Sequence, residues 1–333
     1  MMRVPKEGLI DLHVHLDGSL GFDLAQKLAA SQGMEVISGE ALRARMQVTE
    51  NCRNLNDYLT KFDYPLSLMQ TEEAVKTSVY ELLKIQASQG LVYSEIRFAP
   101  QLHRQRGLTQ RSVVAAAVGG LEKYRSETGA EGMAANLILC CMRGGDNRDE
   151  NMETVSAAEE FFGRGVCGLD LAGAEALFPT GNFEDVFKLA GEKNIPFTIH
   201  AGEADGPESI WKALEFGAKR IGHGVRCLED GELVRYLAEN KIPLELCPTS
   251  NMNTKIFHHI SEYPLLRLMD AGIRVTVNTD NMTVSGVTVR EELQLMADTF
   301  GLGEQEIGQL LRNSADSAFL ADADEKQRLK MKK

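Results

Sequence analysis

The chain has 333 residues, 43% of them hydrophobic and 25% charged, which is typical of a globular protein that buries a sizeable core. Its formal net charge of −12 argues against a nucleic-acid partner, because phosphate contacts need clustered lysine and arginine. No apolar run reaches membrane-spanning length and the N-terminus lacks a signal-peptide core, so we expect no membrane partner. The six cysteines lack Cys-x-x-Cys spacing, which favours buried thiols and a cytoplasmic location.

The first expected strand, residues 9–16, alternates apolar and polar side chains. One of its faces carries Asp11, His13, His15 and Asp17, while leucine and valine side chains form the other face. Imidazole and carboxylate groups are standard zinc ligands, so this polar face suits a divalent cation. An edge strand with a solvated polar face would show the same pattern, and this segment alone does not decide between the two.

An unusually long segment of about 75 residues separates this strand from the next expected one. Four helix-like stretches are expected within it, at 20–31, 39–47, 55–62 and 71–89. A single crossover helix would need far fewer residues. We therefore expect the extra helices to form a lid over the active face of the fold, with Phe62, Tyr64, Leu66 and Leu68 as candidates for an apolar wall or for core packing.

The rest of the chain alternates between short apolar runs and amphipathic segments. The expected strands lie at 9–16, 91–98, 134–141, 166–172, 195–200, 219–223, 242–247 and 273–279. Helices are expected between most of them, at 109–127, 150–162, 183–193, 207–216, 229–240 and 261–271. Eight β-α units predict a (β/α)8 TIM barrel, here as a single domain over residues 1–333. An open doubly wound sheet is disfavoured, because no Gly-x-Gly-x-x-Gly turn follows the first strand.

Chemically active side chains occur where later strands end. His200 ends one apolar strand and Glu203 follows it, His223 ends another between two glycines, and Asp280 follows the last. The carboxyl ends of barrel strands meet at one face, so these side chains should converge with those of the first strand. Three imidazoles and a carboxylate leave a coordination position for water, which is the pattern of a catalytic zinc site. In the alternative interpretation, His223 is a core histidine, while Glu203 and Asp280 cap a helix and a turn.

Five motifs together resemble the adenosine deaminase family over almost the whole chain. They are His-Val-His-Leu-Asp-Gly-Ser at 13–19, Asp-Leu-Ala-Gly at 170–173, His-Ala-Gly-Glu at 200–203, Gly-His-Gly at 222–224 and Asn-Thr-Asp at 278–280. The resemblance implies one Zn²⁺ per chain, or another divalent transition metal, held by His13, His15, His200 and Asp280. It also implies hydrolytic deamination of adenosine and deoxyadenosine to inosine and deoxyinosine, a reaction of purine salvage.

The resemblance further assigns catalytic and substrate-binding residues. Glu203 would protonate the purine ring nitrogen beside the reacting carbon, and His223 would orient or deprotonate the attacking water. Asp17 would bind a ribose hydroxyl, the Gly173 amide a ring nitrogen, and His15 would border the substrate as well as the metal. The expected partner is a small purine nucleoside, and the oligomeric state is not predicted.

One position departs from the commoner family pattern, because Asn281 follows Asp280 where a second aspartate is frequent. An asparagine amide can still donate a hydrogen bond to the purine, so we expect Asn281 to keep a substrate contact. Other 6-aminopurine substrates remain alternatives: adenine, AMP or a modified adenine nucleoside. A non-catalytic nucleoside-binding relative is a further alternative, although no expected ligand or acid is missing. Asp17 favours a ribose-bearing substrate, because adenine-specific relatives tend to carry glutamate at that position.

Overall fold

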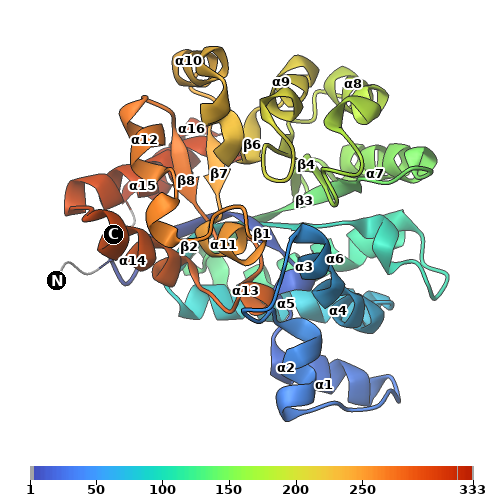
Figure 1. Ribbon diagram of the computed structural model, residues 1–333. Coiled ribbons are helices and arrows are strands. Elements are labelled where there is room, and N and C mark those ends of the chain that lie inside the picture. Colours follow the sequence, from blue (N-terminus) through green and yellow to red (C-terminus); the bar gives the residue numbers. More distant parts are fainter. Residues whose placement is uncertain (1–3, 321, 332–333) are drawn as a thin grey trace.

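The computed structural model describes residues 4–320 and 322–331, and these form an α/β fold in which every paired strand is parallel to its neighbour (Figure 1). The strands are β1 (Leu9–His15), β2 (Leu91–Phe98), β3 (Ala134–Met142), β4 (Val166–Ala172), β5 (Thr198–Ala201), β6 (Arg220–His223), β7 (Leu244–Leu246) and β8 (Val275–Val277). All eight predicted strands are therefore confirmed. β7 is shorter than expected because Pro243 precedes it without an amide donor and Pro248 begins a helix soon after it.

The strands form two four-stranded sheets in chain order, β1-β2-β3-β4 and β5-β6-β7-β8. Isolated parallel bridges occur at both places where the sheets meet. Leu169 of β4 pairs with Phe197, just before β5, and Val14 of β1 pairs with Asp280, just after β8. At the second bridge the His15 amide donates to the Asp280 carbonyl at 2.7 Å. This bridge brings the first and the last polar motif of the sequence together.

Helices surround the strands on the outside (Figure 1). The crossover helices that follow β2 to β6 are α6 (Gln110–Thr128), α7 (Arg148–Phe161), α8 (Glu184–Glu192), α9 (Pro207–Phe216) and α10 (Gly231–Glu239), and the crossover after β7 includes the short α12 (Leu265–Asp270). They match the helices predicted from periodicity. Further helices not named in the sequence analysis are α11 (Pro248–Asn253), α13 (Met282–Ser285), α14 (Val289–Phe300), α15 (Glu304–Ser317) and α16 (Ala323–Met331).

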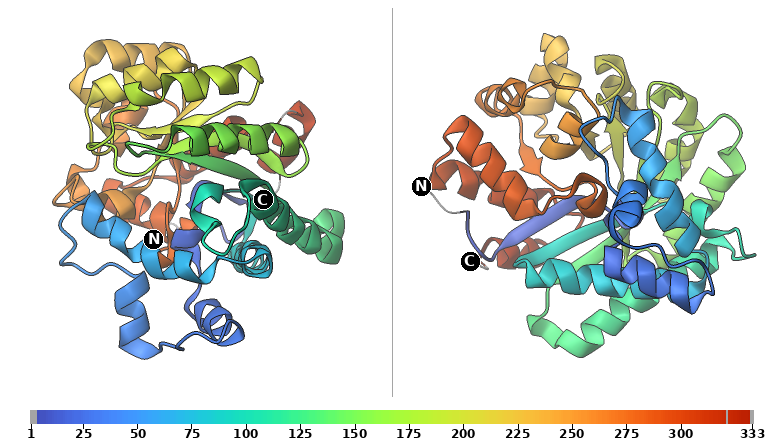
Figure 2. Two further views of the ribbon diagram at one scale, coloured as in Figure 1. Left: turned by 90° about the vertical axis from the view of Figure 1, so that its right-hand side faces the viewer. Right: turned by 60° about the horizontal axis from the view of Figure 1, so that its bottom comes forward.

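The long segment between β1 and β2 is helical, as predicted. Its helices are α1 (Phe22–Ser31), α2 (Gly39–Met46), α3 (Leu55–Leu59), α4 (Asp63–Leu68) and α5 (Glu72–Ser88). α5 packs along α6 in the outer layer, whereas α1 and α2 project away from the strands (Figure 1). In the right-hand view of Figure 2 the blue helices of this segment lie across one end of the strands.

Side chains of β2, β4, β6 and β7 form a buried ion-pair network. The Arg97 guanidinium lies 3.0 Å from Asp170 and 2.9 Å from Glu245, and Arg220 lies 2.5 Å from Glu245 and 2.7 Å from Glu95. Buried charges of this kind persist only when each is paired, since their desolvation is costly. The network forms the floor beneath the polar strand ends. No helix among the described residues is long and apolar enough to cross a membrane.

Candidate active site

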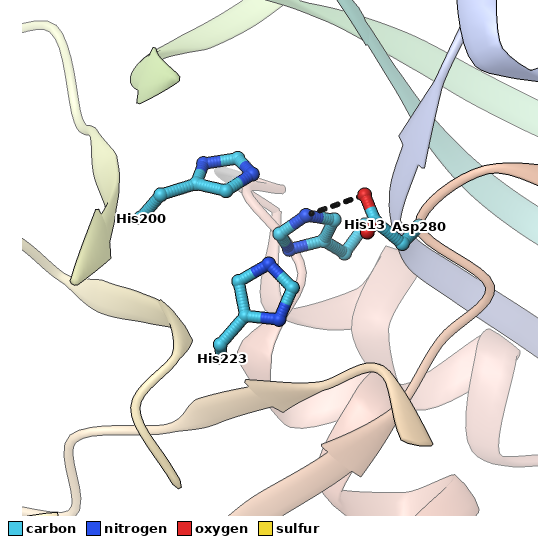
Figure 3. A group of neighbouring side chains, drawn as sticks. All are labelled: His13, His200, His223 and Asp280. Atoms are coloured by element: carbon cyan, nitrogen blue, oxygen red, sulfur yellow. Dashed lines mark ion pairs between the residues drawn. The ribbon is translucent and has the colours of Figure 1, made fainter. Parts of the chain in front are cut away.

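Three histidines and one aspartate from four separate segments converge at the carboxyl ends of the strands. They are His13 of β1, His200 of β5, His223 of β6 and Asp280 after β8, and Figure 3 shows their side chains pointing toward one another. Each offers one ligand atom, and these atoms all lie within 4.8 Å of one another. All four residues are buried. This group of four can hold a metal ion, and it includes three of the four residues that the sequence predicted as ligands.

Close backbone packing makes the convergence possible. A Cβ atom on Gly222 would lie 3.2 Å from His13 Cε1 and 3.1 Å from the His200 Cα, so glycine lets β6 approach both histidines. His223 and Asp280 have φ angles of 59° and 61°, in a region that side-chain-bearing residues rarely adopt. Such strained conformations are typical of functional positions. Both strands thus end in a turn that directs its polar side chain inward.

His15 lies at the edge of this group. Its Nε2 is 3.2 Å from Nε2 of His200 and 3.4 Å from Oδ1 of Asp280. The group within 4.8 Å contains His223 instead of His15, whereas the family resemblance implied His15 as the ligand. Both imidazoles therefore border the same centre.

A further layer of carboxylates orients two of the histidines, and the sequence analysis did not identify it. His13 Nδ1 lies 2.8 Å from Glu245 Oε2, and His200 Nδ1 lies 2.9 Å from Asp170 Oδ2. Since a carboxylate can only accept, each Nδ1 carries the proton and each Nε2 presents a lone pair to the centre. Arg97 holds both carboxylates in place. This carboxylate–histidine arrangement is characteristic of metal sites.

The donor set can accommodate a cation at its centre. The His13 Nε2 is buried and faces Asp280 Oδ1 at 3.4 Å. Although burial and Arg97 act in the opposite sense, the Asp280 and Glu245 carboxylates raise the pKa of His13 above its ordinary 6.5. The position between these two atoms therefore favours positive charge, which either a proton or a metal ion can supply. Burial lowers the pKa of His15 and His223 well below the ordinary 6.5, which keeps these rings neutral. Although burial acts in the opposite sense, neighbouring imidazoles lower the pKa of Asp280 and keep it ionised. Neutral imidazoles beside a carboxylate are a ligand set for Zn²⁺.

His223 has the opposite tautomer. Its Nδ1 lies 3.1 Å from the Asn251 amide nitrogen, and Tyr263 donates to the Asn251 carbonyl oxygen at 3.2 Å, which fixes the amide orientation. The Nδ1 therefore accepts a hydrogen bond, and the proton resides on Nε2, 3.6 Å from Glu203 Oε2. A protonated Nε2 favours a donor role over metal ligation for this ring. No motif in the sequence pointed to Asn251 or Tyr263.

A cavity of about 290 Å³ opens beside this centre. The residues predicted to contact substrate or take part in catalysis line it, namely His15, Asp17, Gly173, Glu203, His223 and Asn281. Its apolar wall includes residues of α3, of the turn after it and of α4, among them Phe62 and Leu66. Tyr64 and Leu68, the other two candidate wall residues, pack in the core. The inserted helices therefore contribute directly to the cavity.

The acidic groups of the cavity differ in their ionisation. Burial, with contributions from the Asp280 and Glu175 carboxylates, raises the pKa of Glu203 well above its ordinary 4.5. This shift favours the protonated form of Glu203, the form in which a carboxyl group can act as an acid. Burial also raises the pKa of Asp17, to about 6, so this carboxyl remains largely ionised at neutral pH.

Asn281 lies at the N-terminus of α13 but does not cap it through its side chain. Its amide oxygen is buried and lacks a hydrogen-bond partner. The oxygen packs against Gly18, and the residue lines the cavity beside Tyr58.

Comparisons with known proteins converge on one family. A family model described as adenosine deaminase matches residues 8–332. The adenosine deaminase of Haemophilus ducreyi is 46% identical, with coverage of 98% of this chain and 96% of the relative. The crystal structure of an adenine deaminase from Arthrobacter aurescens superposes with a TM-score of 0.88 at 27% identity, covering 97% of both chains. An amidohydrolase from Burkholderia ambifaria, solved with bound Zn, gives a TM-score of 0.86 at 23% identity, covering 98% of this chain and 88% of its own.

Proposed function

The chain belongs to the adenosine deaminase family, and we propose that it hydrolyses adenosine and deoxyadenosine to inosine and deoxyinosine with release of ammonia, as an enzyme of purine salvage. The observation that carries this proposal is the juxtaposition of a buried glutamate, Glu203, whose pKa is raised by its burial, with the buried histidine–aspartate centre beside one cavity. Deamination needs both an activated water and a proton donor for the ring.

We further propose that the two sheets close into a single (β/α)8 barrel domain over residues 1–333. The bridges at both seams and the barrel-like relatives support this architecture. The helices between β1 and β2 would serve as a lid, which the lining of the cavity by α3 and α4 supports. Six buried free cysteines fit a reducing cytoplasm.

Zinc fits the donor set, and His13, His15, His200 and Asp280 would hold it. Zinc, when bound, would lower the pKa of a coordinated water and so make a nucleophile available at neutral pH. The two Nε2 lone pairs fixed by Glu245 and Asp170 would point at the ion. His15 is favoured over His223 as the third imidazole ligand, because Asn251 keeps the proton of His223 on Nε2.

The remaining residues would act on the substrate. Glu203 would donate its proton to the purine ring nitrogen, and the His223 Nε2 proton would orient the attacking water. The Gly173 amide would donate to another ring nitrogen, Asp17 would accept from a ribose hydroxyl, and Asn281 would donate to the five-membered ring. All five line the same cavity, which supports these roles.

The charge of the cavity favours a nucleoside over a nucleotide. Arg143 is the single lysine or arginine among the described residues that line it. The Arg143 guanidinium donates to the Phe178 and His200 carbonyls and to Thr180, so it is engaged by the protein. Asp17 and Asp63 also line the cavity and would repel a 5′-phosphate. Free adenine is the second candidate, because of the structural likeness to an adenine deaminase.

An ultraviolet assay across adenosine, deoxyadenosine, adenine and AMP, combined with metal analysis, tests the proposal. We expect the highest kcat/KM with the two nucleosides, about one zinc per chain and loss of turnover on chelation. His13→Ala and His200→Ala should remove metal and turnover together. Preference for adenine or AMP would refute the substrate assignment, and full activity of a metal-free sample would refute the site.

A further inference from the structure

A buried glutamate outside all the predicted roles holds the turn that carries Glu203. Glu175 lies in the loop after β4, two residues beyond Gly173, and is only 1% exposed. Its Oε1 accepts from the Gly202 amide at 2.7 Å, and its Oε2 accepts from the amides of residues 203, 204 and 205 at 3.0, 2.7 and 3.0 Å. The Ser209 hydroxyl adds a fifth hydrogen bond, to Oε1 at 2.5 Å.

Four successive amides that point at one carboxylate form a concave anion site of the main chain. Residues 202–205 connect β5 to α9, and no regular helix or strand supplies acceptors for these amides. Gly202 has a φ of 71°, which starts the turn in a left-handed conformation. A buried amide without an acceptor is strongly unfavourable, so the conformation of this turn depends on the Glu175 carboxylate.

We infer that Glu175 is a positioning residue for catalysis, which clamps the 202–205 turn so that the Glu203 carboxyl faces the buried histidines. This inference rests on the proposed function, because it assigns Glu175 a role through the acid proposed above. The Glu203 side chain itself has a hydrogen bond of only 3.3 Å from Asn251 and a contact of 3.6 Å with His223. The Glu203 backbone amide, by contrast, donates to Glu175 Oε2, which also accepts from the next two amides of the turn.

The position of Glu175 adds a link between substrate binding and acid placement. Gly173, which would donate its amide to the purine, and Glu175 lie in the same short loop after β4. The loop would therefore position the purine ring through the Gly173 amide, and it would position the proton donor Glu203 through the Glu175 carboxylate. A displacement of about 1 Å of a catalytic group can lower turnover about a hundredfold, so this link is catalytically important.

Two substitutions at Glu175 test the inference in the zinc-loaded full chain. Gln keeps one carbonyl oxygen but replaces the other acceptor by an NH₂ group, while Ala removes both acceptors. Ser209→Ala is the matched control, because it removes the hydroxyl donor and leaves all four amide contacts intact. Leu237→Ala, in the buried face of α10, controls for a general loss of stability far from the turn. The readouts are kcat and KM for adenosine, zinc per chain, Tm and hydrogen exchange of the 202–205 amides.

We expect kcat to fall about tenfold in Glu175→Gln and about a hundredfold in Glu175→Ala, with KM changed less than about threefold and zinc retained. Hydrogen exchange of the 202–205 amides should be faster in Glu175→Ala than in the parent. The control Leu237→Ala should have a lower Tm, but its kcat and the exchange of these amides should equal those of the parent. Ser209→Ala should lower kcat less than Glu175→Gln.

Parental kcat in Glu175→Ala, unchanged exchange of the turn amides, or a loss of zinc that matches the loss of kcat would overturn the inference. If the parent leaves adenosine untouched, the proposed function fails, while the exchange comparison still decides whether Glu175 holds the turn.

Discussion

Replacement of Glu245 by glutamine isolates the effect of the carboxylate that orients His13. Glu245 is fully buried in β7, and its Oε2 lies 2.8 Å from His13 Nδ1 and 2.9 Å from Arg97 Nη2. Arg220 Nε contacts its other oxygen at 2.5 Å. Glutamine has nearly the same shape but only one acceptor oxygen and no charge, so one side of the side chain must present NH₂ to a buried donor.

The magnitude follows from the hydrogen bond to His13. A bond to a charged acceptor contributes about 1.5–3 kcal/mol and a neutral one about 0.5–1.5 kcal/mol, so the change weakens the His13 support by roughly 1–1.5 kcal/mol. This corresponds to about a tenfold weaker zinc affinity. The loss of charge also leaves Arg97 and Arg220 with less compensation, and breaking a buried pair costs about 3–5 kcal/mol of folding stability. Both effects should appear, but in separate measurements.

Zinc affinity is measured by competition with a chelator, well below the Tm of the variant. We expect Glu245→Gln to raise the zinc Kd about tenfold and to lower the Tm. Glu292→Gln is the matched control, since Glu292 is a buried glutamate that accepts from the Thr249 amide and contacts no metal-site histidine. Its zinc Kd should equal that of the parent. A folded Glu245→Gln variant with parental zinc affinity would refute the assigned role of this carboxylate.

Four further outcomes are expected. Glu203→Gln should lower kcat by at least about a hundredfold with little change in KM, because the proton that Glu203 donates acts mainly in the transition state. A near-normal kcat in a steady-state assay would exclude Glu203 as the proton donor. Asp17→Asn should narrow the preference for adenosine over AMP, measured as the ratio of kcat/KM values, since it removes a charge that repels phosphate. Asn281→Ala should lower kcat/KM about tenfold or more through a lost hydrogen bond, and parental kinetics would show that Asn281 does not contact the substrate. Burial raises the pKa of Glu292 from an ordinary 4.5 to about 8, so the folded state binds this proton more tightly and loses stability as the pH rises from 4.5 to 8. Glu292→Gln lacks this titration, so its free energy of unfolding relative to the parent should rise by about 4 kcal/mol between pH 5 and 9; equal pH profiles in urea unfolding would contradict this.

The periodicity of the sequence predicted the α/β class and nearly every element that precedes the last strand. Parallel strands buried on both faces are apolar runs, and the crossover helices between them are amphipathic, so both leave a clear signal. The helices after β8 were not named, although α14 begins with a capping box of Thr288 and Glu291 that could have marked its start. The short α11 and α13 have too few residues to show a helical period, so pattern alone could not reveal them.

The sequence predicted a site residue only where that residue lies at the end of a strand or in one of the five motifs. His13, His200 and Asp280 are visible because a polar side chain interrupts an apolar run. Glu245 was hidden, because a single glutamate between leucines in a short strand also fits a partly solvated strand position. Glu175 was hidden for another reason. Its partners are backbone amides 27–30 residues away, and no side-chain pattern records them.

The charges of the buried network fit a divalent metal ion at the site. The contiguous groups beneath and at the site comprise four carboxylates and two guanidiniums, namely Glu95, Asp170, Glu245, Asp280, Arg97 and Arg220. Two negative charges thus lack a cationic partner unless the histidines are protonated or a divalent ion binds. Burial lowers the pKa of His15 and His223, whereas the Asp280 and Glu245 carboxylates raise that of His13 against the effect of its burial. A divalent ion would balance both negative charges and leave the imidazoles neutral and able to ligate. The ion-pair network that connects the strands therefore also favours a divalent ion at the site.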